Sequence, residues 1–230
     1  MSNSELFDSH HGISLFSLVM EFNLYPVRYV HLSWLKRDEH YKLIHKLKTD
    51  DNTHNHLSEY LLKRFKLKDK FDFDFEAREK RVVFASTEEL EKLALYLGII
   101  LNDDVIRASV KRKERLALEQ CLGTEAYRFA VKKAQFIGGA SGQAGPSLLI
   151  DWNHLDRFKQ FLTTTGLQII AGAYADTSTA FRKRLTLKMP REWQKILINT
   201  QDAPLSKAIC TRLLTKTHRE VNRQWRHLLS

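Results

Sequence analysis

Hydrophobic residues recur three or four positions apart along most of this chain, the spacing that places them on one face of a helix. This spacing predicts helices over residues 38–48, 53 or 55 to 67, 86–101, 103–122, 124–137, 151–164, 191–198 and 204–229, with a further apolar segment at 167–175. We therefore expect a mainly α-helical protein with a compact multi-helix fold.

Capping signals fix several of the expected helix ends. Ser86 and Glu89 stand three apart before an apolar run, the capping-box pattern in which each side chain bonds the other residue's backbone N–H. Gly123 is placed to end the helix at 103–122. Pro190 and Pro204 stand where proline is tolerated, at the first turn of the helices that follow them.

One short region alternates with a period of two instead. Phe71, Phe73 and Phe75 are separated by aspartates, which is typical of a strand, and residues 82–85 could form a second one. The pattern predicts at most a small β-hairpin.

A Gly-rich stretch, Gly138–Ser147, has no periodic apolar face and is typical of a linker or loop. It divides the chain into a predicted N-terminal helical lobe at 22–137 and a C-terminal helical lobe at 148–230. Residues 1–21 are predicted to form a flexible N-terminal lead. The fold is thus expected to contain two lobes.

The longest apolar run, Leu93–Leu101, is too short to span a bilayer, which needs about 20 residues. The apolar patch at 13–20 follows Glu5 and Asp8 rather than Lys or Arg, the reverse of a signal peptide. Cys121 and Cys210 lie far apart without metal-ligand spacing, which suits a reducing compartment. We therefore place the protein in the cytoplasm, although an uncleaved bacterial export signal would escape this test.

The positive charge is concentrated near the C-terminus. Of the formal net charge of +10, residues 181–230 carry +9, with twelve Lys and Arg against three acidic residues. On the helix expected at 204–229, the apolar side comprises Ile209, Leu213, Val221, Trp225 and Leu228. The opposite side carries five cations, Arg212, Lys216, Arg219, Arg223 and Arg226. Such a face is either a solvated surface or a docking surface for an acidic partner.

No motif in the sequence assembles a catalytic or metal site. His54 and His56 point to different sides of a helix and lack further ligands at metal-binding spacing. The Gly-rich stretch lacks the Lys of a phosphate-binding loop and the second Gly of a nucleophile elbow. We expect a protein that is not an enzyme and that has no cofactor and no metal.

Two segments resemble the SctK family, accessory proteins of the cytosolic sorting platform of the type III secretion injectisome. The first is Phe22–Leu35, with Pro26, Tyr29, His31, Ser33 and Trp34. The second runs from Arg182-Lys183-Arg184-Leu185 to Pro190-Arg191-Glu192-Trp193 and precedes the long basic helix. The Gly-rich insert and the residues before Phe22 depart from the family pattern.

This resemblance implies a non-catalytic adaptor that links the cytosolic domain of the inner-membrane ring protein SctD to the pods built by SctQ. The adaptor would stand at the cytosolic face of the inner membrane through protein contacts only. Its predicted partner-binding residues are Tyr29, His31, Trp34, Arg212, Lys216, Arg219, Arg223 and Arg226, because aromatic and Arg anchors carry much of the affinity in interfaces.

Two other functions remain open at this point. The basic helix could bind a nucleic-acid backbone, with affinity that falls steeply as salt increases. A peripheral membrane protein would need a free apolar face beside the basic one. The apolar stripe with Val221 and Trp225 weakens the nucleic-acid alternative, because these side chains are suited to burial.

Overall fold

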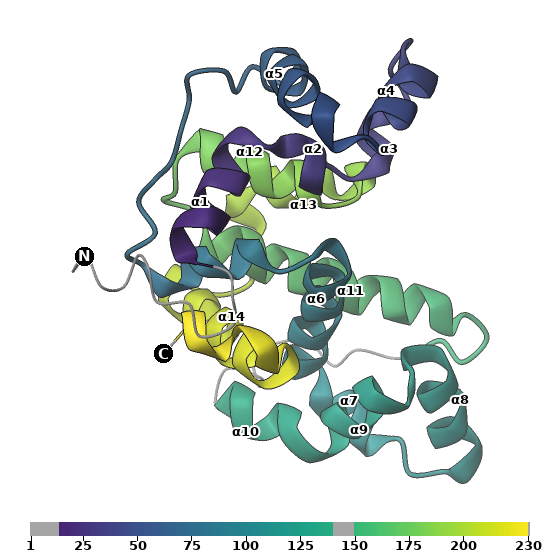
Figure 1. The fold of residues 1–230 in the computed structure, drawn as a ribbon. Coiled ribbons are helices and arrows are strands. Elements are labelled where there is room, and N and C mark those ends of the chain that lie inside the picture. The colour runs from purple at the N-terminus through teal and green to yellow at the C-terminus, as the bar shows by residue number, and fades with distance from the viewer. Residues whose placement is uncertain (1–13, 140–149, 230) are drawn as a thin grey trace. The chain divides into compact units, whose positions relative to one another are not determined.

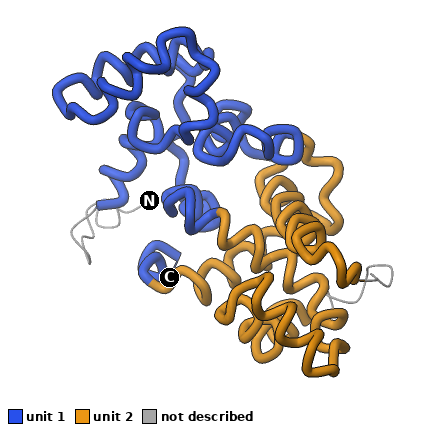
Figure 2. The backbone as a smooth tube through the Cα atoms, turned by 90° about the vertical axis from the view of Figure 1, so that its right-hand side faces the viewer, with its two compact units in different colours: residues 1–90, 176–198, 224–230 blue, residues 91–175, 199–223 orange. Residues whose placement is uncertain are grey.

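The computed structural model describes residues 14–139 and 150–229. Most of these residues are helical and none of them forms a β-strand, so the predicted mainly α-helical fold is confirmed. The chain divides into two compact units, each assembled from separate stretches (Figure 2). Unit 1 comprises residues 1–90, 176–198 and 224–230, and unit 2 comprises 91–175 and 199–223. The predicted linker at 138–147 falls mostly outside the described residues.

Unit 1 contains the first five α-helices and a helical pair from later in the chain (Figure 1). Its α-helices are α1 (Leu15–Leu24), α2 (Pro26–Tyr29), α3 (Leu32–Leu35), α4 (Tyr41–Leu47), α5 (His54–Arg64), α12 (Thr179–Lys188) and α13 (Gln194–Ile198). Its short 3-10 helices are η1 (Asp51–Thr53), η2 (Arg78–Phe84), η5 (Arg191–Trp193) and most of η7 (Arg223–Leu228).

Unit 2 is built around two long helices. Most of α6 (Thr87–Leu101) belongs to it, and α11 (Leu155–Ala173) is the longest helix of the described chain. The others are α7 (Asp103–Ala108), α8 (Arg112–Leu122), α9 (Thr124–Phe129), the π-helical turn η3 (Ala130–Ala134), α10 (Gln135–Gly138), η6 (Thr200–Asp202) and α14 (Lys207–Val221).

The predicted capping box at the start of α6 is confirmed. The backbone N–H of Ser86 donates to Glu89 Oε2 at 2.7 Å, and the backbone N–H of Glu89 donates to Ser86 Oγ at 3.2 Å. Each bond uses a backbone donor that lacks a partner within the helix.

Helix α1 begins inside the segment 1–21 that was expected to be a flexible lead. The Ser14 hydroxyl accepts a hydrogen bond from the Ser17 N–H at 3.2 Å, and Leu15 and Val19 turn into the core. Helical structure in unit 1 therefore begins earlier than the aromatic segment at Phe22 suggests. Residues 1–13 lie outside the described chain.

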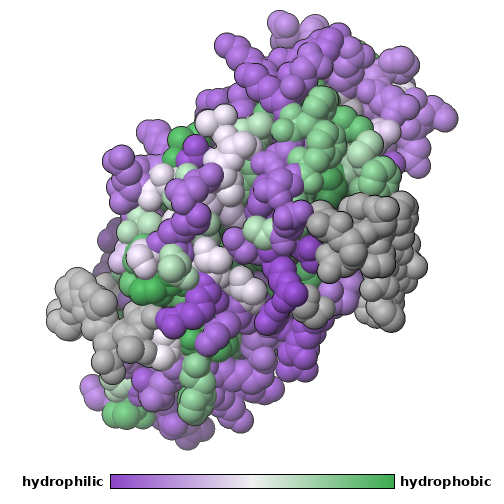
Figure 3. Space-filling model, turned by 90° about the vertical axis from the view of Figure 1, so that its left-hand side faces the viewer, coloured by the Kyte–Doolittle hydropathy of each residue, from purple (hydrophilic) through white to green (hydrophobic). Residues whose placement is uncertain are grey.

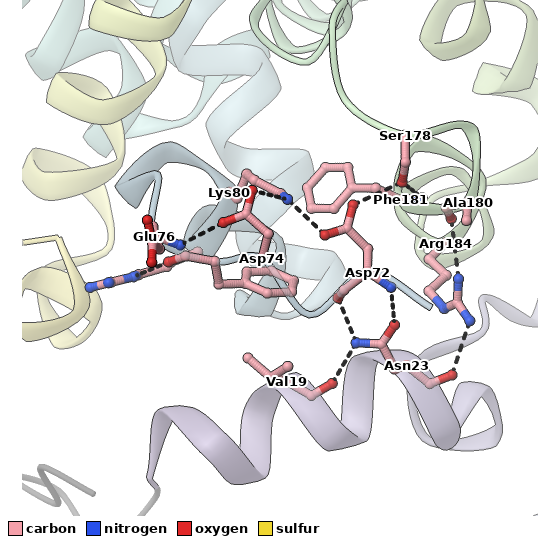
Figure 4. Close-up of polar contacts among 12 residues, drawn as sticks. Val19, Asn23, Asp72, Asp74, Glu76, Lys80, Ser178, Ala180, Phe181 and Arg184 are labelled. Atoms are coloured by element: carbon pink, nitrogen blue, oxygen red, sulfur yellow. Dashed lines mark hydrogen bonds and ion pairs between the residues drawn. The ribbon is translucent and has the colours of Figure 1, made fainter. Parts of the chain in front are cut away.

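The predicted hairpin is absent from the described residues. Asp72 is held by α1 instead of by a second strand, because its N–H donates to Asn23 Oδ1 at 2.8 Å and its carbonyl accepts from Asn23 Nδ2 at 2.8 Å (Figure 4). Residues 82–85 belong to a buried stretch that is largely 3-10 helix. A side-chain amide from a distant helix thus satisfies the backbone groups that a strand would have paired.

An aromatic cluster forms part of the core of unit 1. The rings of Phe22, Phe75 and Phe181 lie with centroids 5.5–6.0 Å apart, and the Phe84 ring stacks on Phe75 at 4.9 Å. The fully buried Arg184 guanidinium donates to the Asn23 carbonyl at 3.1 Å. Because a buried charge is costly without hydrogen bonds, this bond fixes α12 against the end of α1.

Beside this network, Lys80 and Asp72 form a buried ion pair with 2.7 Å between Nζ and Oδ1. Ser178, the N-cap of α12, donates to the other Asp72 oxygen at 2.8 Å. Figure 4 shows these polar contacts converging on Asp72 from three parts of unit 1. A substitution that removes one partner of such a pair destabilises the fold, because it leaves the other charge buried and unpaired.

In unit 2, α6 and α11 cross at two glycines. A Cβ placed on Gly98 would lie 1.8 Å from the Leu162 carbonyl oxygen, and one on Gly166 would lie 1.7 Å from the Ala94 carbonyl oxygen. The two backbones are thus in direct contact, which only residues without a side chain permit.

The helices expected at 103–122 and 204–229 are each interrupted. The first divides into α7 and α8 at residues 109–111, and the second into α14 and η7 at Asn222. Conversely, the segments expected at 151–164 and 167–175 join into the single helix α11. Apolar spacing continues across these breaks, which is why periodicity alone does not reveal them.

Candidate partner-binding surfaces

The predicted aromatic anchors belong to the interior of unit 1. Tyr29 and Trp34 are each 8 % exposed. The Tyr29 hydroxyl donates to the Phe22 carbonyl at 2.8 Å, and burial raises its pKa. The Trp34 indole N–H donates to the Met189 carbonyl at 2.9 Å. Both polar ends are thus satisfied within the unit, as expected for core residues.

His31, the third predicted anchor, is half-buried and caps α3. Its Nδ1 accepts from the Ser33 N–H at 3.2 Å and lies 2.7 Å from the Ser33 hydroxyl. Burial, followed by the charges of Lys36 and Lys48, lowers its pKa. The neutral imidazole that this favours is the form that can accept at Nδ1.

The Trp34 side chain nevertheless reaches one concave surface. A groove of about 320 Å³, which we call the α12–α13 groove, is lined by Trp34 and Phe65 and by residues of the two helices that give it its name. Of the predicted anchors, Trp34 is the one that contributes to this groove.

The predicted cations near the C-terminus fall on two elements. Arg212, Lys216 and Arg219 lie on α14, and Arg223 and Arg226 lie on η7. Four of these five cations are exposed, and Arg219 is half-buried. The buried face of α14 comprises Cys210, Leu213, Leu214, Thr217 and His218.

The predicted apolar side is only partly buried. Leu213 and Leu228 are in the interior, whereas Ile209, Val221 and Trp225 are half-buried. The Trp225 indole N–H donates to the Glu89 carboxylate at 2.9 Å. Trp225 follows the break at Asn222, so its side chain no longer obeys the helical register of α14.

One end of α14 borders a cleft of about 350 Å³ in unit 2, which we call the cationic cleft. Its lining residues are Lys92 and Tyr96 from α6, Glu125, Arg128 and Phe129 from α9, Lys132 and Lys133 from η3, and Glu220, Val221 and Arg223. Five cations therefore face two carboxylates. Among the predicted residues, Arg223 belongs to this cleft.

The two carboxylates are already engaged. Glu125 pairs with Lys92 at 3.1 Å, while Glu220 pairs with Lys133 and, at 3.4 Å, with Arg223. Hydrogen bonds from Lys133, then nearby positive charge, lower the pKa of Glu220. Arg128 and Lys132 are exposed and form no ion pair with any residue that the structure describes. The cleft therefore has two cations available for an acidic group.

An aromatic floor supports the cationic cleft. The Tyr96 and Phe129 rings have centroids 4.6 Å apart, and the Lys92 ammonium lies 5.6 Å from the Tyr96 ring. Burial, with a smaller contribution from the Glu125 charge, raises the pKa of Tyr96 to about 12. The cleft can thus take a carboxylate beside an apolar side chain, an arrangement common in protein interfaces.

Sequence reasoning did not identify Lys92, Arg128 or Lys132 as binding residues. A signal was present, because Arg128 and Lys132 are four positions apart in a segment expected to be helical and so share a face. Lys92 has no comparable signal, since only the packing of α6 near α9 brings it to the cleft.

The two cysteine thiols are not activated as nucleophiles. Burial raises the pKa of both Cys121 and Cys210, which keeps the thiols protonated. Burial also lowers the pKa of His218 to about 4. Among residues 14–139 and 150–229, no three His, Cys, Asp or Glu residues gather as metal ligands would. None of the helices there is both long and apolar enough to cross a bilayer.

The exposed surface offers apolar as well as charged side chains. On the face in Figure 3, hydrophobic residues are interspersed with hydrophilic ones. Large apolar side chains with at least half of their area exposed include Phe73, Ile198 and Phe136. Apolar residues scattered in this way are usual on a folded protein and do not by themselves mark a binding site.

Comparison with known proteins identifies one family. The family of YOP proteins translocation protein K (YscK) matches residues 18–230, nearly the whole chain. This match confirms the predicted resemblance to the SctK family. No curated protein and no solved structure matches the chain.

Proposed function

Since the chain belongs to the YscK family and is thus a type III secretion protein, we propose that it acts as a non-catalytic adaptor of the cytosolic sorting platform. In this role it links the cytosolic domain of the SctD-type inner-membrane ring protein to the SctQ-type pod protein. It stands at the cytosolic face of the inner membrane through protein contacts and needs no cofactor.

The observation that carries this proposal is the cationic cleft of unit 2. Arg128 and Lys132 present two charges without described partners above an aromatic floor, which matches an acidic side chain next to an apolar one. Charged contacts of this kind steer and select a partner. An adaptor requires such surfaces and no reacting group.

Binding of nucleic acid by the basic C-terminal helix is the alternative. The apolar face of α14 is already buried within unit 2, so only its exposed side, with Arg212 and Lys216, is available for contacts. Phosphate contacts from that side would give an affinity that falls steeply with salt. Binding to a DNA duplex that weakens steeply as salt increases, without selective binding of either partner protein, would therefore favour this alternative.

The test uses purified full-length chain with the SctQ-type protein and the SctD-type cytosolic domain. Size-exclusion chromatography with light scattering should detect a complex of all three, and the charge-reversed variant Arg128→Glu/Lys132→Glu should lose one partner. Arg112→Glu/Lys113→Glu on α8 is the matched control, because these residues are also exposed cations of unit 2 outside the cleft.

The cations that the sequence predicted near the C-terminus are tested in the same assay. Replacing Arg212, Lys216, Arg219 and Arg223 by Glu should weaken capture of the acidic partner while circular dichroism stays unchanged. If the wild-type chain binds neither protein, or binds a DNA duplex more tightly than both, the adaptor proposal is wrong. If it binds both and the cleft variant does so equally well, the adaptor role stands without this cleft.

A further inference from the structure

The α12–α13 groove of unit 1 is a second concave surface, separate in sequence from the cationic cleft. From α12 it is lined by Thr179, Arg182, Lys183, Thr186 and Leu187. These positions follow the i, i+3, i+4, i+7, i+8 pattern, so one continuous face of α12 forms a wall. Gln194 and Ile198, four apart on α13, line it as well, and the two helices contact each other.

Apolar side chains form the interior of this groove. The Trp34 ring packs edge-on against Phe65 at 6.0 Å between centroids, and Leu187 is buried beside them. Ile198 is 54 % exposed, although it is a large aliphatic residue. The groove thus leaves apolar surface in water that a partner side chain could cover.

The charge around this groove has one sign. Arg182 and Lys183 line it, and none of its described lining residues is acidic. The pKa of Lys183 is lowered, first by burial and then by the positive charges of Lys70 and Lys66. Lys183 therefore stands among like charges, and a carboxylate placed beside it would relieve that repulsion.

The shape favours a helical occupant. The walls come from helices, and the described residues contain no β-strand whose edge could pair with an extended peptide. An amphipathic helix laid in a groove buries one apolar stripe and keeps its charged residues at the rim.

We propose that the α12–α13 groove binds an acidic amphipathic helix of a partner protein, with apolar side chains against Trp34, Phe65 and Ile198 and a carboxylate on Lys183. This inference rests on the proposed adaptor function, because the partner is then a second component of the secretion machine. It gives unit 1 a docking site of its own, in addition to the cleft of unit 2.

The test places a photo-crosslinking amino acid at position 198 of the full chain, with position 43 as control. Leu43 is also an exposed aliphatic residue of unit 1, 56 % exposed, and lies on α4 outside the groove. Crosslinks to the SctQ-type protein and the SctD-type domain are mapped by mass spectrometry. The expected result is a crosslink from position 198 to an acidic amphipathic segment of one of them, and none from position 43.

Affinity measurements provide the second arm. Lys183→Glu and Ile198→Asp should each weaken binding of that partner about tenfold, the effect of losing one interface anchor. The matched controls Lys42→Glu and Leu43→Asp should bind as wild type does. Because residues 183 and 198 are exposed, all four variants should retain the wild-type thermal transition.

Three outcomes would overturn the groove proposal. These are a crosslink to a second copy of this chain, a crosslink to the chain's own residues 1–13, or affinities that the groove substitutions leave unchanged. If the wild-type chain captures both partners in the last case, the groove proposal fails while the adaptor function stands. If the wild-type chain captures neither partner, the adaptor function itself fails.

Discussion

Replacing Gly98 by alanine should destabilise unit 2, although alanine is the better helix former. In an uncrowded helix the change would stabilise the protein by about 0.8–1.0 kcal/mol. Here the new Cβ would lie 1.8 Å from the Leu162 carbonyl oxygen, where ordinary contact begins near 3.4 Å. Helices α6 and α11 would have to move apart by more than about 1 Å, which forfeits packing along the whole crossing.

The size of this effect follows from the opposing contributions. Overpacking typically costs about 1–3 kcal/mol, and a backbone-to-backbone clash belongs at the upper end because neither atom can rotate away. After the propensity gain of about 1 kcal/mol, Gly98→Ala should lower the free energy of unfolding by about 2 kcal/mol. Gly166→Ala should cost a similar amount, since its Cβ meets the Ala94 carbonyl oxygen at 1.7 Å.

Urea unfolding followed by far-ultraviolet circular dichroism measures these differences. Gly138→Ala is the control, because its Cβ would meet the Ile100 Cγ2 methyl group at 3.0 Å, which can shift, and the Ile100 carbonyl oxygen only at an ordinary contact distance of 3.5 Å. The double variant at 98 and 166 should cost less than the sum of the single variants, because the first separation admits the second methyl group. If the single variants were as stable as wild type or more so, the close crossing of α6 and α11 would be refuted.

Three further predictions concern stability. Trp34→Ala should cost about 3–5 kcal/mol in urea unfolding, as expected for a core tryptophan; unchanged stability with failed assembly would instead assign the ring to an interface. Because burial lowers the pKa of His218 to about 4, the unfolded state binds the proton more readily and stability should fall as the pH drops from about 6.5 to 4. His218→Gln should flatten that profile, measured by thermal unfolding across this range. Glu89→Ala should lower the free energy of unfolding in urea by about 2 kcal/mol, since it removes a capping bond and the acceptor for the Trp225 indole N–H. If Ser86→Ala lowered it by as much or more, Glu89 would not have this dual role.

The features that sequence predicted well are those decided locally. The capping box at Ser86 and Glu89 needs only residues three apart, and the structure forms both of its bonds. Helical spacing likewise identified the mainly α-helical fold. The cationic residues of α14 were identified for the same reason, because one helix determines which side chains share its face.

The features that sequence missed depend on distant partners. Phe71, Phe73 and Phe75 alternate like a strand, but Asn23, nearly fifty residues earlier, binds the backbone between them. The cationic cleft combines side chains of α6, α9 and α14, and the α12–α13 groove combines Trp34 with residues near 180. Tyr29 and Trp34 were predicted as surface anchors because aromatic residues serve both cores and interfaces, and composition does not distinguish these roles.

The discontinuity of unit 1 has a consequence for biosynthesis. Residues 224–230 belong to this unit, where Leu228 and Leu229 are buried and the Leu228 carbonyl accepts from Arg81 at 3.0 Å. The ribosome synthesises these residues after all of unit 2. Unit 1 therefore cannot complete its fold until nearly the whole chain has been translated. Nascent chains that stop at residue 223 should therefore remain sensitive to protease in their first ninety residues, long after those residues have left the exit tunnel.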